Sequence, residues 1–171
     1  THISSGGSVD AIHNAKKSYK KVTCDTCPHY FSLTDEATLG FDTNTKVNPP
    51  LRGKEDVESI KEGLKNSTID IIATDHAPHT SEEKSNTYFK APSGGPLVQH
   101  SLAAMLELYH KGVFSLGKIV EKMCHNPAIL FNIKGRGFIR EGYQADLCLV
   151  NPDDPWTASK ENILYKCGWS P

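Results

Sequence analysis

The sequence lacks the features that mark several large classes of protein. Its 19 basic and 20 acidic residues nearly balance and are scattered, so they form no basic patch for nucleic acid or an anionic membrane surface. No apolar run approaches the roughly 18 residues that cross a bilayer, and residues 1–10 lack the basic and apolar regions of a signal peptide. We therefore expect a soluble, cytoplasmic protein that acts on a small molecule.

Cysteine is also sparse. The five cysteines are an odd number in a chain too long to need disulfides for stability, so reduced thiols are expected. Cys24 and Cys27 form a C-x-x-C, which could be a redox pair or half of a structural zinc site. No second pair follows at zinc-finger spacing, and we rank both roles below that of ordinary reduced thiols.

The composition is that of a globular protein, with 37% hydrophobic and 23% charged residues. Its 171 residues are enough for one sizeable core. Residues 1–4 resemble the end of a strand that runs into a Gly-Gly turn without a polar lead-in, so we expect the chain to be cut from a longer protein. Helical spacing of apolar residues and β-branched runs predict the remaining elements. Helices are expected at 8–19 (with Ser8 as N-cap), around 57–64, at 96–111 and at 116–124, and further strands at 21–26 and 68–74.

Two long segments fall between these elements. Residues 28–52 are irregular in composition and residues 80–95 are polar, which is typical of functional loops. Strands that alternate with helices predict a parallel sheet, in either a doubly wound fold or a (β/α)8 barrel. Three strands cannot close a barrel, which takes about 250 residues. Near the C-terminus, residues 135–142 and 145–150 predict two short strands of a small β module.

Polar residues that suit metal chemistry follow the predicted strands. His2 ends the first, and Asp75, His76 and His79 follow the third. Imidazole and carboxylate groups at neighbouring strand ends suit a divalent metal such as zinc, and Asp75 could also transfer a proton from an activated water. Each residue also has a purely structural interpretation: His2 as an ordinary terminal histidine, and Asp75 as an Asx-turn. His29 could face either the cavity or the barrel wall.

An ordered set of motifs resembles the dihydroorotases, a branch of the amidohydrolase superfamily. These motifs are H-I-S-S at 2–5, C-P-H-Y at 27–30, K-V-N-P-P-L-R at 46–52 and I-A-T-D-H-A-P-H at 72–79. N-P-A at 126–128 and G-Y-Q-A-D-L at 142–147 resemble a tail shared across the superfamily. The resemblance implies an α/β fold: about the last three βα units of a partial (β/α)8 TIM barrel at residues 1–132, and part of a small C-terminal β module at 133–171.

The same resemblance implies roles for individual residues. His2 would be a zinc ligand, and Asp75 both a metal ligand and the general acid/base. Asn48 would bind the ring amide and His79 the substrate carboxylate. The backbone around Pro92 and Gly94 would close over the ring, although Ser93 and Gly95 depart from the expected family pattern.

The implied reaction is the zinc-dependent, reversible hydrolysis of dihydroorotate to N-carbamoyl-L-aspartate in de novo pyrimidine biosynthesis, by an enzyme with one or two zinc ions. The H-x-H, bridging carboxylate and further histidine of the family site do not occur in these residues. We therefore expect this chain alone to be inactive, to bind zinc weakly and to oligomerise with itself. A hydantoinase- or allantoinase-type cyclic amidase, or a non-catalytic assembly subunit, remain the alternatives.

Overall fold

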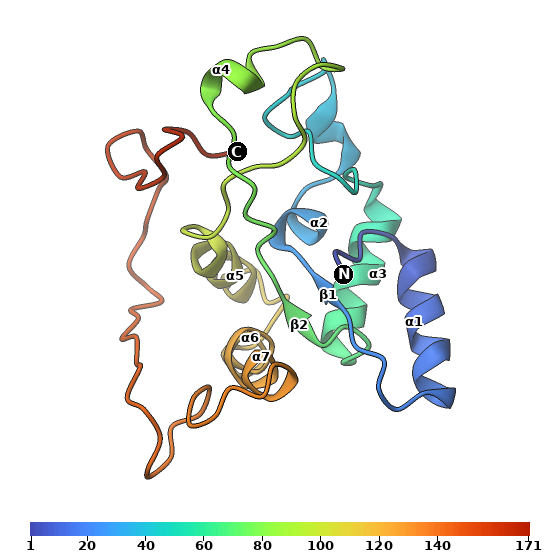
Figure 1. Ribbon diagram of the computed structural model, residues 1–171, viewed down its shortest axis with the longest axis vertical. Coiled ribbons are helices and arrows are strands. Elements are labelled where there is room, and N and C mark those ends of the chain that lie inside the picture. The colour runs from blue at the N-terminus through green and yellow to red at the C-terminus, as the bar shows by residue number, and fades with distance from the viewer.

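A small parallel sheet lies at the centre of the molecule, with helices around it (Figure 1). The computed structural model describes all of residues 1–171. Strand β1 (Asp25–Thr26) pairs in parallel with β2 (Ile71–Ile72), with Asp25 opposite Ile71 and Thr26 opposite Ile72. Flanking backbone hydrogen bonds, such as that from Ala73 N to Thr26 O at 2.9 Å, lengthen this pairing. The predicted parallel arrangement is confirmed.

Residues 1–4 do not form the regular strand that their sequence predicts. Ile3 N donates to Asp25 O at 2.8 Å, but His2 has a left-handed φ of 54°, which ends any extended pairing. The carbonyls of Asp25 and Thr26 point to opposite sides of β1, and that of Thr26 faces β2. The first segment therefore lies along the other edge of β1, in the place of the predicted strand.

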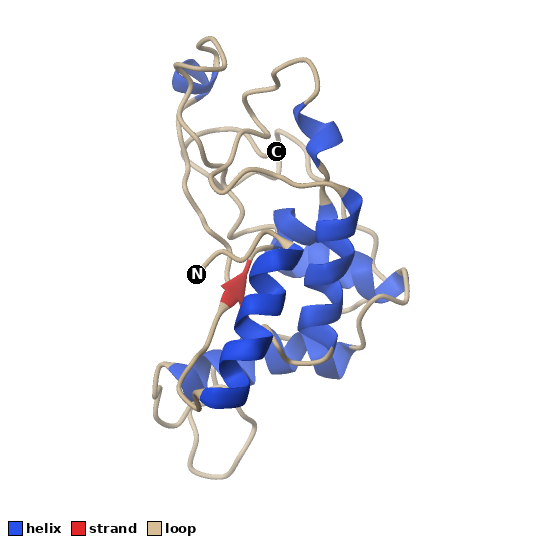
Figure 2. Ribbon diagram, turned by 90° about the vertical axis from the view of Figure 1, so that its right-hand side faces the viewer, coloured by secondary structure: helices blue, strands red, loops and turns tan.

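Two helices cover one flank of the sheet and pack side by side (Figure 2). Helix α1 (Gly6–Ser18) begins after Ser5, whose hydroxyl accepts a hydrogen bond from Ser8 N, so the predicted N-cap at Ser8 is wrong by three residues. The Gly-Gly pair is helical instead of forming a turn, because the serine before it caps the first turn. Helix α3 (Lys54–Lys65) confirms the predicted amphipathic helix, with its apolar face buried.

The loop predictions were partly wrong. Residues 28–52 contain helix α2 (Pro28–Ser32), with proline in its first turn, and the 3-10 helix η1 (Asp35–Thr38). Residues 80–95 contain the short helix α4 (Ser81–Lys84), which a capping box begins. Such single turns are too short for apolar periodicity to reveal.

The second half of the chain is helical. Helix α5 (Ser101–His110) is shorter than predicted, since residues 96–100 precede it as an irregular segment. The helix predicted at 116–124 is divided into α6 (Leu116–Val120) and the π-helical turn η2 (Glu121–His125), and α7 (Asn126–Leu130) follows. The core draws large apolar side chains from α2, α3, α5 and the segment before β2: Tyr30, Phe31, Ile60, Leu64, Ile69 and Met105.

Residues 133–171 contain no helix or strand, so the two strands predicted at 135–142 and 145–150 are wrong. The apolar side chains of that segment, among them Leu147 and Leu149, are exposed, and an isolated pair of short strands buries too little to be stable. The segment runs along the outside of the molecule and returns toward α4 (Figure 1). Trp169 fixes its end by donating from Nε1 to His79 O at 2.7 Å.

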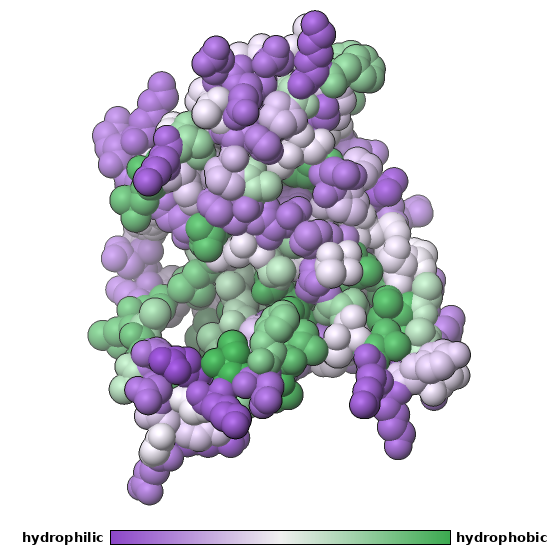
Figure 3. Space-filling view, in the orientation of Figure 1, coloured by the Kyte–Doolittle hydropathy of each residue, from purple (hydrophilic) through white to green (hydrophobic).

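Apolar surface gathers on one part of the molecule. Figure 3 shows hydrophobic residues over the lower half of this face, whereas the upper part, over α4 and its loops, is mainly hydrophilic. Exposed apolar side chains at the end of the helical region include Ile129, Leu130 and Phe131. No helix is both long and apolar enough to cross a membrane.

Candidate active site

The predicted metal pair comes together at the carboxyl ends of the strands. His2 precedes α1 beside β1, and Asp75 follows β2. The His2 Nε2 and Asp75 Oδ1 atoms are 3.6 Å apart, although 72 residues separate the two in sequence, and both side chains are partly exposed. The carboxyl edge of a parallel sheet is where α/β proteins place their active sites. The metal role of the two residues stays a prediction.

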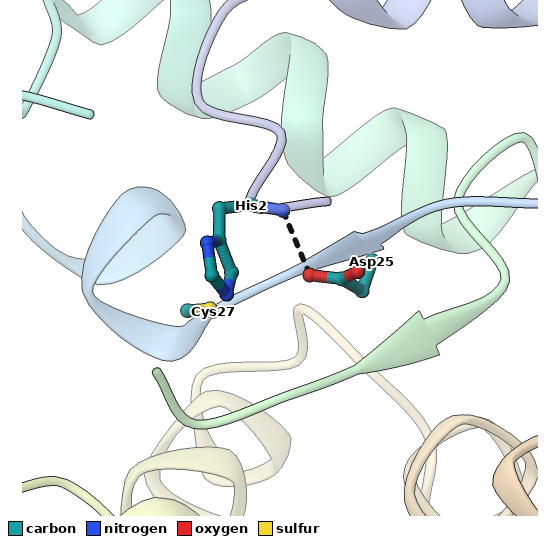
Figure 4. Close-up of side chains that lie close together, drawn as sticks. All are labelled: His2, Asp25 and Cys27. Atoms are coloured by element: carbon teal, nitrogen blue, oxygen red, sulfur yellow. Dashed lines mark hydrogen bonds between the residues drawn. The ribbon is translucent and has the colours of Figure 1, made fainter. Parts of the chain in front are cut away.

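Both residues have an unusual backbone. His2 has φ 54° and Asp75 has φ 48°, in the left-handed region that residues other than glycine rarely adopt. Such conformations cost on the order of 1 kcal/mol and occur where surrounding contacts impose them, often at functional sites. At His2 that contact is a hydrogen bond from its backbone N–H to Asp25 Oδ1 at 2.8 Å (Figure 4).

Cys27 and His29 lie immediately behind this pair. The Cys27 side chain is fully buried, and the thiol lies beside the His2 imidazole in Figure 4. His29 is 5% exposed, and neither of its ring nitrogens has a hydrogen-bond partner. Burial, and to a lesser extent His2, lower the pKa of His29 to about 4. The His29 ring is therefore neutral near pH 7, and the structure places it in the interior at the sheet end.

The donor atoms fit a zinc ion. One oxygen, one sulfur and one nitrogen from Asp75, Cys27 and His29 lie within 4.8 Å of one another, and so do those of His2, Asp25 and Cys27. Imidazole, carboxylate and thiolate are the ligand types that zinc prefers. Burial, together with the Asp75 and Asp25 carboxylates, raises the pKa of the Cys27 thiol far above its ordinary value. The thiol therefore carries its proton unless a cation displaces it.

Three of the four predicted substrate-binding residues are brought together by the structure. The His79 Nε2 atom lies 3.0 Å from Ser93 O, between Pro92 and Gly94. Gly94 has φ 125°, and a Cβ there would lie 2.7 Å from the Ala77 side chain, so this position needs glycine. The fourth residue, Asn48, is exposed and makes no hydrogen bond to His79. Their substrate roles remain untested.

The residue that anchors the 92–94 backbone could not be predicted from the sequence. Lys84, on α4, is 2% exposed, and its ammonium donates to Gly94 O at 2.9 Å and Pro92 O at 3.1 Å. Nothing in the polar run S-E-E-K-S distinguishes this lysine from its exposed neighbours. His76, which the sequence grouped with Asp75, instead accepts a hydrogen bond from Leu97 N at its Nδ1 atom.

A separate apolar cavity of about 140 Å³ is lined in part by His29. Its lining includes Leu33, Val47 and Leu51 but neither His2 nor Asp75. The cavity is therefore distinct from the space in front of the predicted metal pair.

Parallel strands that alternate with helices and present imidazole and carboxylate groups at their carboxyl ends define an α/β protein, and the match to the amidohydrolase family assigns it to the TIM-barrel type. The chain belongs to the amidohydrolase family, whose family model matches residues 10–166.

Curated relatives of the chain are dihydroorotases. The protein of that name from Endomicrobium trichonymphae is 50% identical over 171 residues, which cover 99% of this chain and 40% of the relative. The dihydroorotase of Geobacter metallireducens is 46% identical over 170 residues, with the same coverage of each chain. The predicted resemblance is thus confirmed, and the chain spans about two fifths of the length of these relatives.

Solved structures agree on the fold. The L-hydantoinase (dihydropyrimidinase) of Arthrobacter aurescens matches with a TM-score of 0.78 and 32% identity, over 84% of this chain and 33% of that one. The dihydroorotase of Saccharomyces cerevisiae, solved in complex with 5-fluoroorotic acid, matches with a TM-score of 0.69 over 78% of this chain and 37% of that one. Its identity of 17% shows a shared fold alone.

Proposed function

We propose that this chain is the C-terminal part of a dihydroorotase, which interconverts dihydroorotate and N-carbamoyl-L-aspartate in de novo pyrimidine biosynthesis. The observation that carries the proposal is the His2–Asp75 pair at the end of a parallel sheet, 3.6 Å apart. The chain that contains this pair is 50% identical to a dihydroorotase. A hydrolase of this class needs a carboxylate beside its metal, and Asp75 would supply it.

The fold supports a corresponding division of the chain. Residues 1–132 would be about the last three βα units of a (β/α)8 barrel, and residues 133–171 part of a small module outside it. In support, the last regular element, α7, ends at Leu130. The exposed apolar side chains near it are typical of a surface that further protein covers, whether the remaining barrel or a second subunit of a homo-oligomer.

His2 and Asp75 would hold zinc, with the other ligands supplied by the remainder of the enzyme. Zinc held there would supply Lewis-acid chemistry, for the ring carbonyl and for the attacking water. Asp75 would accept a proton from the attacking water and deliver it to the ring nitrogen as the carbon–nitrogen bond breaks. In ring closure the same carboxylate would take the proton from that nitrogen and return it to the departing water.

The remaining residues would bind the substrate. His79 would bind the substrate carboxylate and Asn48 the ring amide, while the backbone at Pro92 and Gly94 closes over the ring. The contact between His79 and Ser93 O supports this arrangement, because it holds two of these groups in one place. The substrate is a small molecule, and the proposed location of the enzyme is the cytoplasm.

A comparison of two substrates tests the proposal. The full-length protein should hydrolyse dihydroorotate with a much larger kcat/KM than hydantoin, because His79 would have a carboxylate to bind only in the first. A larger kcat/KM for hydantoin would overturn the proposal. It would favour the second candidate, a hydantoinase- or allantoinase-type amidase, which the match to the Arthrobacter aurescens structure supports.

Two further statements complete the proposal. The 171-residue chain alone should show no turnover, because the H-x-H, the bridging carboxylate and the further histidine of the family site do not occur in it. Cyclisation of carbamoyl-aspartate by this chain would contradict that. A full-length protein without activity, and with a degenerate H-x-H upstream, would instead be the non-catalytic assembly subunit.

A further inference from the structure

The end of the C-terminal tail returns to the segment between β2 and α4, which carries one of the predicted substrate contacts (Figure 1). Residues 133–161 contain no helix or strand that could hold this end in place. Trp169 instead donates from its indole nitrogen to the His79 carbonyl at 2.7 Å, although 90 positions separate the two residues in sequence. The tail is therefore attached directly to the residue that is proposed to bind the substrate carboxylate.

Gln99 attaches the tail at a second point. Its side-chain amide donates to Asn162 O at 2.8 Å and accepts from Leu164 N at 2.9 Å. Its backbone N–H donates to the Tyr165 hydroxyl at 2.7 Å. Contacts with the tail thus lie at both ends of the segment 79–99, and they hold the tail in register with that segment.

The indole ring of Trp169 also lies beside the ammonium group that anchors the 92–94 backbone. The Lys84 Nζ atom is 5.5 Å from the centre of the ring, a distance at which an indole face attracts a cation. The ring is close to the backbone as well, since a Cβ built on Gly95 would lie 3.8 Å from Trp169 Cη2. One side chain therefore contacts both His79 and the cation that holds 92–94.

The imidazole and the backbone of His79 are held by different partners. The ring nitrogen Nε2 lies 3.0 Å from Ser93 O, which fixes the direction of the ring. The backbone is held by Trp169 and, two residues earlier, by the hydrogen bond from Ala77 N to Gly95 O at 3.1 Å. Hydrogen bonds weaken steeply with distance and angle, so a shift of this backbone would move the imidazole away from its ligand.

We propose that Trp169 is a positioning residue, whose indole N–H holds the His79 backbone, and thereby the imidazole, where the substrate carboxylate binds. This inference rests on the proposed function and adds a residue of the C-terminal tail to it. Trp169 acts through His79 and not on the reacting atoms. The carboxylate is not part of the bond that is cleaved, so its contacts stabilise the bound substrate and the transition state alike. Their loss raises KM and leaves kcat unchanged.

Steady-state kinetics of the full-length Trp169→Phe variant measure this split. Phenylalanine keeps an apolar aromatic ring and removes the N–H donor. KM for dihydroorotate should rise about two- to tenfold, the range expected for one neutral hydrogen bond, with no change in kcat. Trp156→Phe removes the same group at an exposed position and is the matched control, which should change neither constant. Circular dichroism checks that each variant is folded.

A double-mutant cycle tests whether Trp169 acts through His79. His79→Ala should raise KM more than Trp169→Phe does. Addition of Trp169→Phe to His79→Ala should raise KM no further, because no imidazole remains to be positioned. The same increase in both backgrounds would show a merely structural role and would overturn the inference. An unchanged KM in Trp169→Phe, or a fall in kcat at constant KM, would also overturn it.

Amide hydrogen exchange tests the positioning without any substrate. The Ala77 N–H, which donates to Gly95 O, should exchange about two- to tenfold faster in Trp169→Phe and at the parent rate in Trp156→Phe. Unchanged exchange at Ala77 in Trp169→Phe would overturn the inference while leaving the proposed function standing. Absence of dihydroorotate turnover by the unmodified full-length protein would overturn the proposed function, and exchange at Ala77 would still decide whether Trp169 holds this backbone.

Discussion

Replacement of Lys84 should release the backbone that is predicted to close over the substrate ring. The Lys84 ammonium is buried and donates to the carbonyls of Gly94, Pro92 and, at 3.4 Å, Lys46. Burial, and then the nearby Lys46, lower the pKa of Lys84. Three carbonyls from two separate loops thus depend on one donor group.

Lys84→Met keeps an unbranched side chain that is one heavy atom shorter, and it removes the ammonium that donates to all three carbonyls. The two shorter hydrogen bonds from a charged donor contribute about 1.5–3 kcal/mol each, or roughly 3–6 kcal/mol together. Relief from burying an ammonium offsets several kcal/mol of this. We expect a net local loss of about 2 kcal/mol, which corresponds to roughly 30-fold more frequent opening of the loop.

Amide hydrogen exchange measures this opening at one atom. Gly94 N donates to Lys46 O at 2.9 Å, so its exchange rate reports whether the two loops stay together. That rate should rise roughly 30-fold in Lys84→Met, while amides in α3 keep their protection. Lys90→Met, at an exposed position of the same loop, is the control and should change neither the exchange rate at Gly94 nor the protection of the α3 amides. Unchanged exchange at Gly94 in Lys84→Met would refute the reasoning.

Two further predictions concern stability. Although burial raises the pKa of Glu121, hydrogen bonds from Lys118 and Lys122 outweigh it and lower that pKa to about 2. The pKa of Glu121 in the folded state is below that in the unfolded state, so this stabilisation is present above about pH 4.5 and is lost toward pH 2. After discounting for partial exposure, we expect the ionised carboxylate to stabilise the fold by about 1 kcal/mol. Urea denaturation should therefore give Glu121→Gln a lower free energy of unfolding than the parent at pH 6, and a smaller difference between the two proteins at pH 3. An equal difference at both pH values would contradict this. Gly94→Ala should lower the melting temperature through a loss of about 1–3 kcal/mol, since its Cβ would lie 2.7 Å from a neighbouring methyl carbon. Gly7→Ala, with open space at that position, should not lower it.

The parts of the fold that follow from repeated patterns could be predicted. Helix α3 has apolar residues at helical spacing over three turns, and the β-branched run at 68–74 contains β2. The strands of the tail could not be excluded, because alternating sequence does not reveal whether a partner strand is present. The π-helical turn η2 was missed because its residues continue the helical pattern of α6.

Only part of the candidate site could be predicted from the sequence. His2 and Asp75 could be placed together because each follows a predicted strand, and parallel strands end at one edge. The burial of Cys27 and His29 against them depends on the direction in which α2 turns after β1, which no local pattern specifies. Lys84 was missed for a related reason: its burial depends on two distant loops folding around its ammonium.

The exchange of the Asp75 carboxylate for an amide tests the proposed proton transfer. Asp75→Asn in the full-length protein preserves the shape of the side chain but removes the group that would transfer the proton. We expect kcat for dihydroorotate to fall by about 10²–10⁴, while Asp10→Asn, at an exposed position, leaves it unchanged. A kcat for Asp75→Asn equal to that of the parent would contradict the account.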